Sequence, residues 1–195
     1  MFVMDNQGAK YEVDEGLRTR AQQLMKAPEF ESLISHVDLD QVVFLRVSGK
    51  KADWHGKCTY IGKAPQTIIA KYVVYKLQEF GVLDLSQLRN VDEDLFDIRY
   101  FITINDDTIC MTADSSKVED VVIVHELMHI KATADGVVKH DVEDFSDIQK
   151  MFGPFWTQGM FPEAVDADGV VTSSFPNIPQ PISAPSDSFS SEESD

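Results

Sequence analysis

The chain has 195 residues, of which 43% are hydrophobic and 26% are charged, so one compact domain with a buried core is expected. Its 33 acidic residues outnumber 17 Lys and Arg residues, which gives a formal charge of −16. This balance disfavours nucleic acid as a general partner, because neutralising phosphates requires a basic surface, although it leaves room for a small local basic patch.

The sequence also disfavours a membrane protein and a disulfide-rich protein. No apolar run is long enough for a transmembrane helix, and the N-terminal stretch MFVMDNQGAKYEVDEG lacks the apolar centre of a signal peptide. Two cysteines, Cys58 and Cys110, are too few for a disulfide framework or a four-thiolate metal site, and both are expected to be small buried hydrophobes. We therefore expect a soluble cytoplasmic protein with no membrane partner.

The chain changes character near its C-terminal end. Residues 164–195 contain no Lys or Arg and six acidic residues, and from Thr172 onward Ser and Pro dominate. Such a segment cannot bury enough apolar surface to offset its chain entropy. We predict a folded domain over residues 1–163 and a disordered acidic tail over 164–195, which serves solubility or, alternatively, docks a partner.

The first half of the folded part is predicted to mix helices and strands. Residues 14–36 favour a helix that is interrupted near Pro28, because proline cannot continue a helix. The apolar run QVVFLRV over residues 41–47 predicts a strand. Residues 64–80 favour a helix stopped by Gly81, although their β-branched content keeps a strand open.

The second half begins with a further strand. DIRYFITI over residues 97–104 predicts that strand, followed by a turn and a short returning strand at 108–111. Ser116 and Glu119 have capping-box spacing, which predicts a helix over residues 117–135. Apolar residues on nearly every side of this helix indicate that it is central. Another helix is expected from Asp141 to Gly153.

The central helix contains His125-Glu126-Leu127-Met128-His129. Two histidines four residues apart lie on one helix face, so both imidazoles can reach one ion. Glu126 lies about 100° further round the helix, where it can take a proton from a water held by that ion. The alternative is that these are hydrogen-bonded core groups, but burying them without partners would be costly.

A catalytic zinc normally requires a third protein ligand. Four downstream residues could supply it: Asp135, His140, Asp141 and Glu143. A chain reversal at Gly136 could bring His140 back to the ion, and neutral imidazole suits zinc. Asp141 fits better as the N-cap of the next helix, with Glu143 in its first turn, and we place Asp135 second. His125, His129 and His140 are therefore the predicted ligands of one Zn²⁺ per chain.

The remaining candidates are less defined. His36 is isolated, and His55 lies in the most basic stretch, Lys50–Lys57, which we expect to be a surface loop or, alternatively, the lining of a substrate cleft. Four residues could stabilise an oxyanion and are not ranked: His55, Tyr60, Tyr100 and Trp156.

HELMHI, a linker and HDVEDFSDIQKMFGPFW together resemble the putative phage metallopeptidase domain, an SprT-like group of zincins. The strand YFITIN and Trp54 in its Lys-rich stretch extend this resemblance, which covers about residues 40–156. It implies a small α+β zincin-like fold with a central HExxH helix packed on a short mixed sheet, three histidine ligands and Glu126 as the catalytic acid/base. For a phage protein the location would be the host cytoplasm.

Together these features predict a zinc-dependent metallopeptidase that acts on a protein or peptide substrate. Glu126 would deprotonate the attacking water and pass the proton to the leaving amine. An extended substrate would pair with the edge of the strand Ile98–Ile104. Three alternatives stay open at this point: a non-catalytic zinc-binding interaction module, an SprT-like DNA-associated protease, and a metal hydrolase with a non-peptide substrate.

Overall fold

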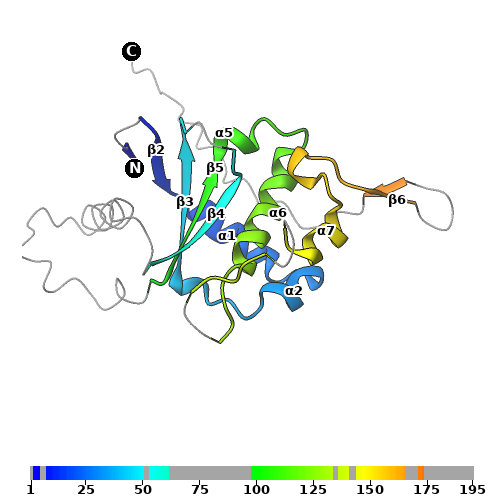
Figure 1. The fold of residues 1–195 in the computed structure, drawn as a ribbon, viewed down its shortest axis with the longest axis horizontal. Helices are drawn as coiled ribbons and strands as arrows, with labels where there is room; N and C mark the ends of the chain where they lie inside the picture. Colours follow the sequence, from blue (N-terminus) through cyan, green and yellow to red (C-terminus); the bar gives the residue numbers. More distant parts are fainter. Residues whose placement is uncertain are drawn as a thin grey trace, which may run out of the picture.

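The computed structural model describes residues 2–4, 8–50, 53–61, 98–133, 136–140, 144–165 and 171–173. These residues form an α+β fold in which helices pack on a mixed sheet (Figure 1). The fold class expected from the sequence is therefore confirmed. The expected helix over residues 64–80 lies outside the described residues.

The main sheet has five strands in the order β1-β2-β3-β5-β4 within the described part of the chain. Its strands are β1 (Phe2–Met4), β2 (Lys10–Val13), β3 (Val42–Ser48), β4 (Gly56–Tyr60) and β5 (Tyr100–Asn105). β3 and β5 run parallel, and the other neighbours pair antiparallel, so the sheet is mixed.

β5 lies inside the sheet, between β3 and β4. All six of its residues are buried, as expected for a strand that is covered on both faces. The prediction that this strand offers an open edge to substrate is therefore wrong. The edge strand is β4, whose short and mixed sequence GKCTY carries no clear strand pattern.

Two helices precede the central strands. α1 (Glu15–Leu24) begins after Asp14, whose side chain accepts a hydrogen bond from the Leu17 N–H at 3.1 Å. α2 (Pro28–Ile34) has proline in its first turn, where no N–H is needed, so the predicted interruption at Pro28 is confirmed. A short 3₁₀ helix, η1 (Leu39–Gln41), leads into β3.

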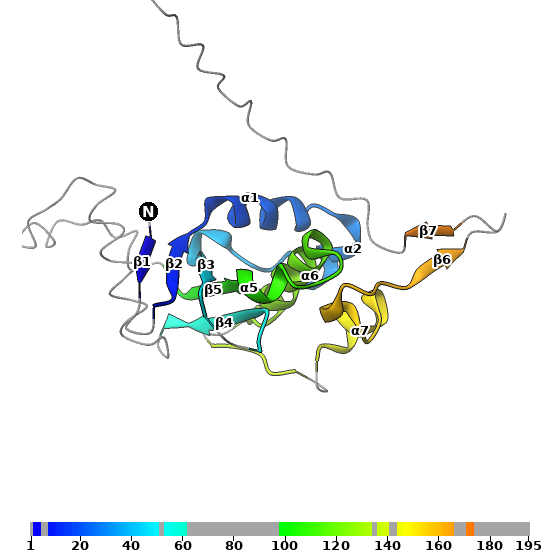
Figure 2. The same cartoon turned by 90° about the horizontal axis from the view of Figure 1, so that it is seen from above.

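Helix α6 (Ser115–Met128) is the centre of the molecule. It packs against β4 and β5 on one side and against α1 and α2 on another (Figure 2). Val118, Val121, Ile123 and Leu127 are fully buried, because apolar residues on all sides of the helix meet a covering element. The prediction of a central helix is therefore confirmed.

Both predicted ends of this helix are wrong. The cap is Asp114, whose side chain accepts from the Lys117 N–H at 3.3 Å, rather than Ser116. Glu119 does not reach back to the cap, because it accepts a hydrogen bond from Arg46 Nη1 at 2.7 Å. The helix ends at Met128 with His129 as C-cap, and not near residue 135.

The short segments around α6 also differ from expectation. Residues 106–109 form α5 (Asp106–Ile109), a single helical turn, where the sequence predicts a turn and a returning strand. α7 (Ser146–Phe152) begins later than the predicted Asp141, because Phe145 is extended, and it ends at Gly153, which has a φ of 79°. Residues 141–143 lie outside the described residues.

The C-terminal part of the described chain contains a second, smaller sheet. It follows the 3₁₀ helix η4 (Trp156–Gln158) and consists of β6 (Glu163–Val165) paired antiparallel with β7 (Val171–Ser173). Strand structure therefore continues past residue 163, where the sequence places the start of the tail. The remainder of the predicted tail, residues 166–170 and 174–195, lies outside the described residues.

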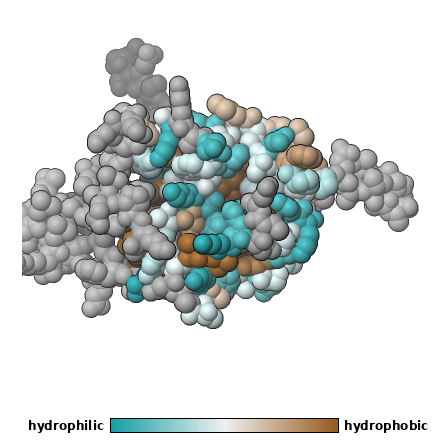
Figure 3. Space-filling model, viewed as in Figure 1, coloured by the Kyte–Doolittle hydropathy of each residue, from teal (hydrophilic) through white to brown (hydrophobic). Residues whose placement is uncertain are grey.

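The surface in Figure 3 mixes hydrophilic residues with short hydrophobic stretches. Among the described residues the exposed large hydrophobics are Met111, Val138, Phe155 and Met160. The helices of the described chain are too short or too polar for any one of them to cross a membrane.

Candidate metal centre

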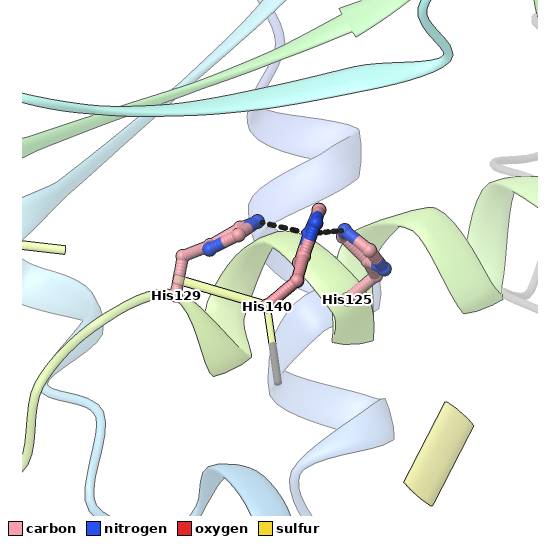
Figure 4. A group of neighbouring side chains, drawn as sticks. All are labelled: His125, His129 and His140. Atoms are coloured by element: carbon pink, nitrogen blue, oxygen red, sulfur yellow. Dashed lines mark hydrogen bonds between the residues drawn. The ribbon is translucent and has the colours of Figure 1, made fainter. Parts of the chain in front are cut away.

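Three imidazoles converge beside the C-terminal end of α6 (Figure 4). His140 Nε2 lies 3.0 Å from His125 Nε2 and 3.2 Å from His129 Nε2. Nitrogen ligands of a tetrahedral zinc ion, each about 2.0–2.1 Å from the metal, lie roughly 3.3–3.4 Å from one another. All three donor atoms lie within 4.8 Å of one another, so the donor set is close to that arrangement, and its chemistry suits one divalent ion such as zinc.

His140 reaches the cluster because the chain reverses after α6. The Val138 N–H donates to the His129 carbonyl at 2.6 Å, and Ile130 and Val137 form an isolated antiparallel bridge. Gly136 adopts a φ of 108° in this reversal, which suits glycine. The predicted reversal at Gly136 is therefore present, and it returns the chain to the helix that supplies the first two histidines.

The same reversal sets the tautomer of His129. Its Nδ1 lies 2.7 Å from the Val138 carbonyl oxygen. Because a carbonyl oxygen can only accept, Nδ1 carries the proton and Nε2 keeps its lone pair toward the cluster. Burial, together with the neighbouring His125 and His140, lowers the pKa of His129, so its ring is neutral at neutral pH.

Asp144 orients His125 from behind. Its Oδ1 lies 2.9 Å from His125 Nδ1, an ion-pair distance at an angle outside hydrogen-bond geometry, and its Oδ2 accepts a hydrogen bond from Trp156 Nε1 at 2.8 Å. Burial acts to raise the pKa of this carboxyl, but contacts with His125 and Trp156 outweigh it, so the pKa of Asp144 is lowered. A carboxylate on the far nitrogen of a metal-binding histidine fixes the ring and raises its basicity.

Phe145 forms an apolar wall behind the cluster. Its ring centroid lies 5.2 Å from that of His125, 4.8 Å from that of His129 and 5.0 Å from that of His140. The side chain is buried, so it restricts the orientations that the imidazoles can adopt. From the sequence, Asp144 and Phe145 are expected only to lie within the helix predicted from Asp141 to Gly153.

Glu126 lies next to the cluster without joining it. Its Oε1 is 4.0 Å from His125 Nε2, and its Oε2 is 3.9 Å from His129 Nε2. The residue is only 4% exposed, and its Oε2 has no hydrogen-bond partner among the described residues. Burial raises the pKa of Glu126 to about 7, a value suited to a group that exchanges protons near neutral pH.

A cavity of about 350 Å³ opens beside Glu126. His55, Trp156 and Thr157 line it together with Glu126 and His125. Burial lowers the pKa of His55, so this imidazole is neutral at neutral pH. Two of the four residues considered for oxyanion stabilisation, His55 and Trp156, thus lie where a substrate could touch them.

The other two oxyanion candidates have different surroundings. Tyr60 and Tyr100 pack together with ring centroids 5.6 Å apart, and the Tyr100 hydroxyl donates to the Gly136 carbonyl at 3.2 Å. Tyr100 therefore supports the chain reversal that carries His140.

The remaining histidine does not join the cluster. His36 Nε2 lies 2.8 Å from the Ile130 carbonyl oxygen, which ties the end of α2 to the end of α6. Asp135, Asp141 and Glu143 lie outside the described residues.

Comparison with known proteins agrees with this arrangement. Neither the curated proteins nor the solved structures provided a significant match. The profile of the putative phage metallopeptidase family matches residues 9–166, a wider span than the resemblance over 40–156, so helices α1 and α2 also fall within the family region. A match over most of the chain shows that this protein belongs to the putative phage metallopeptidase family.

Proposed function

We propose that the protein is a zinc-dependent peptidase, with His125, His129 and His140 holding one Zn²⁺ and Glu126 acting as the general base. The observation that carries the proposal is the buried Glu126 carboxylate, which has an unpartnered oxygen beside three converging Nε2 atoms. A non-catalytic zinc-binding module has no need for such a costly buried carboxylate.

A zinc ion at this site would supply Lewis acidity, which lowers the pKa of a coordinated water toward about 7 and polarises a carbonyl. Glu126 would accept the proton of the attacking water and deliver it to the leaving amine nitrogen. Asp144 would hold the His125 ring in place, and the fixed tautomer of His129 would keep its lone pair available. The buried surroundings of Glu126 would keep bulk water from competing for its proton.

The strand beside Glu126 offers a place for an extended substrate. The Asn105 N–H donates to the His55 carbonyl, and the Ile61 N–H donates to the Arg99 carbonyl, so the odd-numbered residues of this segment pair with β5. Because backbone groups alternate along a strand, those of Gly56 and Cys58 point to the other edge of β4. Within the described residues no strand pairs with that edge. We propose that a peptide lies along this edge, in place of the predicted β5 edge, and pairs with the Gly56 backbone and the Cys58 carbonyl, since the Cys58 N–H binds the Glu126 carboxylate.

Protein or peptide, and not nucleic acid, is the substrate class that we propose. The charge of −16 opposes binding to phosphates. Lys50 of the basic stretch already lies over the rings of Tyr11 and Trp54, 5.7 Å from each centroid, so this lysine and these rings contact one another within the chain.

Glu126→Gln tests the general-base role. The amide matches the carboxylate in size but cannot accept the proton, so we expect peptide cleavage to fall by about 100-fold or more while one zinc stays bound. Purified wild type and variant would be incubated with a denatured cell extract, and new peptide termini would be counted by mass spectrometry beside metal analysis. Equal cleavage by both proteins would contradict the proposal, and zinc binding without cleavage by either would identify a metal-binding module.

A further inference from the structure

The start of β4 lies against Glu126 with no room for a side chain. A Cβ added to Gly56 would lie 2.5 Å from Val122 Cγ1, 2.8 Å from Glu126 Cγ and 2.8 Å from Glu126 Oε1. Gly56 does not have a positive φ, so backbone conformation does not explain the glycine. The requirement is one of space between the strand and the helix.

The closeness of strand and helix has a second consequence two residues further along β4. The Cys58 N–H points to the edge of β4 that pairs with no strand among the described residues, and its hydrogen bond to the Glu126 carboxylate acts to lower the pKa of that group. A backbone donor of this kind holds a carboxylate in one orientation. Gly56 and Cys58 therefore act on the same side chain, one by leaving space and the other by a hydrogen bond.

We propose that Gly56 is a positioning residue for Glu126: its missing side chain lets β4 approach α6 closely enough for the Cys58 N–H to hold the carboxylate beside the three imidazoles. This inference rests on the proposed function, in which Glu126 moves the proton. A methyl group at position 56 would displace either the strand or the carboxylate, since both of its nearest neighbours on α6 are closer than real Cβ contacts allow. A misplacement of about 1 Å is enough to lower a rate by about 100-fold.

Gly56→Ala alone could act by crowding Val122, so the test pairs it with Val122→Ala. The second substitution removes Cγ1, the nearest atom to the new methyl group, but leaves the contacts with Glu126 in place. The double variant is compared with Val122→Ala alone. Ile104→Val, a truncation of the fully buried cross-strand neighbour of Gly56, controls for a general loss of stability.

Three quantities are measured on the zinc-loaded proteins: kcat and KM for peptide cleavage, bound zinc, and hydrogen exchange of the Cys58 amide by NMR. We expect Gly56→Ala to lower kcat by about 100-fold with one zinc retained and KM little changed. The double variant should recover the thermal stability of Val122→Ala but not its kcat. The Cys58 amide should be protected in the wild type and exchange rapidly in Gly56→Ala and in Glu126→Ala. The Ile104→Val variant should be less stable than the wild type but should keep the wild-type kcat and a protected Cys58 amide.

Two results would overturn the positioning role: a double variant with the kcat of Val122→Ala, or a Cys58 amide that stays protected in Gly56→Ala. The exchange measurement needs no substrate, so it separates the two proposals. If the wild type cleaves nothing, the peptidase proposal fails, while loss of Cys58 protection in Gly56→Ala would still support the placement of Glu126 by Gly56.

Discussion

His125 and His129 are each held through Nδ1, the nitrogen that faces away from the cluster. A carboxylate, Asp144, lies behind His125, and a backbone carbonyl, that of Val138, lies behind His129. Both contacts leave Nε2 free to bind an ion. The two rings differ in the charge of their partner: His125 faces a carboxylate and His129 a neutral carbonyl.

Asp144→Asn removes this charge while keeping the shape of the side chain. We expect the affinity for zinc to fall by about 10- to 100-fold, because the amide no longer stabilises the His125 ring in its ligand form. Competition with a chromogenic chelator measures the change. Asp147→Asn, on the exposed side of α7 where Asp147 pairs with Lys150, is the matched control and should bind zinc like the wild type. Equal affinity of the Asp144 variant would show that the carboxylate does not support the ligand.

Because Glu126 is buried, we also expect the free energy of unfolding of the metal-free protein to depend on pH. Burial raises its pKa from 4.5 to about 7 in the folded chain, so folding favours the protonated form. Its contribution to the free energy of unfolding is therefore complete below about pH 4.5 and is lost as the pH rises through about 7. Glu126→Gln is neutral at every pH and escapes this loss. Urea unfolding in a chelator should show that the variant gains on the wild type by about 1–3 kcal/mol between pH 5 and pH 8. A difference that is independent of pH would contradict the buried position of the carboxylate.

The sequence alone indicates those site residues that lie at a recognisable spacing along the chain. His125, Glu126 and His129 are recognisable because four residues make one turn of helix, and His140 because it follows a glycine at which the chain can reverse. Asp144 could not be found in this way. Its role depends on Trp156, twelve residues further along, and on the position of α7, and neither follows from local pattern.

Most differences between the predicted and the observed helices and strands follow from the packing of α6. The stretch DSSKVE offers two caps with equally good spacing, Asp114 to Lys117 and Ser116 to Glu119. The choice falls on Asp114 because Arg46 on β3 draws Glu119 toward the sheet. Strand order is likewise not encoded locally, so the burial of β5 and the edge position of β4 appear only when the sheet is assembled.

Helix α1 is tied to α6 by a buried ion pair. Arg20 Nε and Nη2 donate to the two carboxylate oxygens of Asp120 at 2.6 and 2.7 Å, and both side chains are less than a tenth exposed. Burial acts to raise the pKa of Asp120, and Arg20 opposes that rise, so the carboxylate depends on its partner to stay charged.

Breaking this pair should therefore be costly. Asp120→Asn removes the carboxylate that pairs with the buried Arg20 charge, and we expect the free energy of unfolding to fall by about 3–5 kcal/mol in urea titrations. Asp40→Asn, which breaks the exposed ion pair with Arg18, is the matched control and should cost less than about 1 kcal/mol. Equal losses of unfolding free energy in the two variants would show that the Arg20–Asp120 pair does not stabilise the packing of α1 against α6.

All parts of the proposed active site lie around one helix, α6. α6 supplies two imidazoles and the carboxylate, the chain reversal after it supplies the third imidazole, and the edge strand β4 covers the carboxylate. In the part of the chain that the structure describes, these three histidines are the one group of three or more side chains placed to hold an ion. We therefore expect one ion to bind per chain, through three histidine nitrogens.

X-ray absorption at the zinc edge, combined with metal analysis, can count the imidazole ligands of the bound ion. The wild type should bind one zinc per chain with three imidazole nitrogens at about 2.0 Å and one further light-atom ligand. His140→Ala should lose one imidazole from this set and bind zinc more weakly. A wild-type spectrum that shows two imidazoles or a sulfur ligand, or a His140→Ala spectrum identical to that of the wild type, would contradict the account.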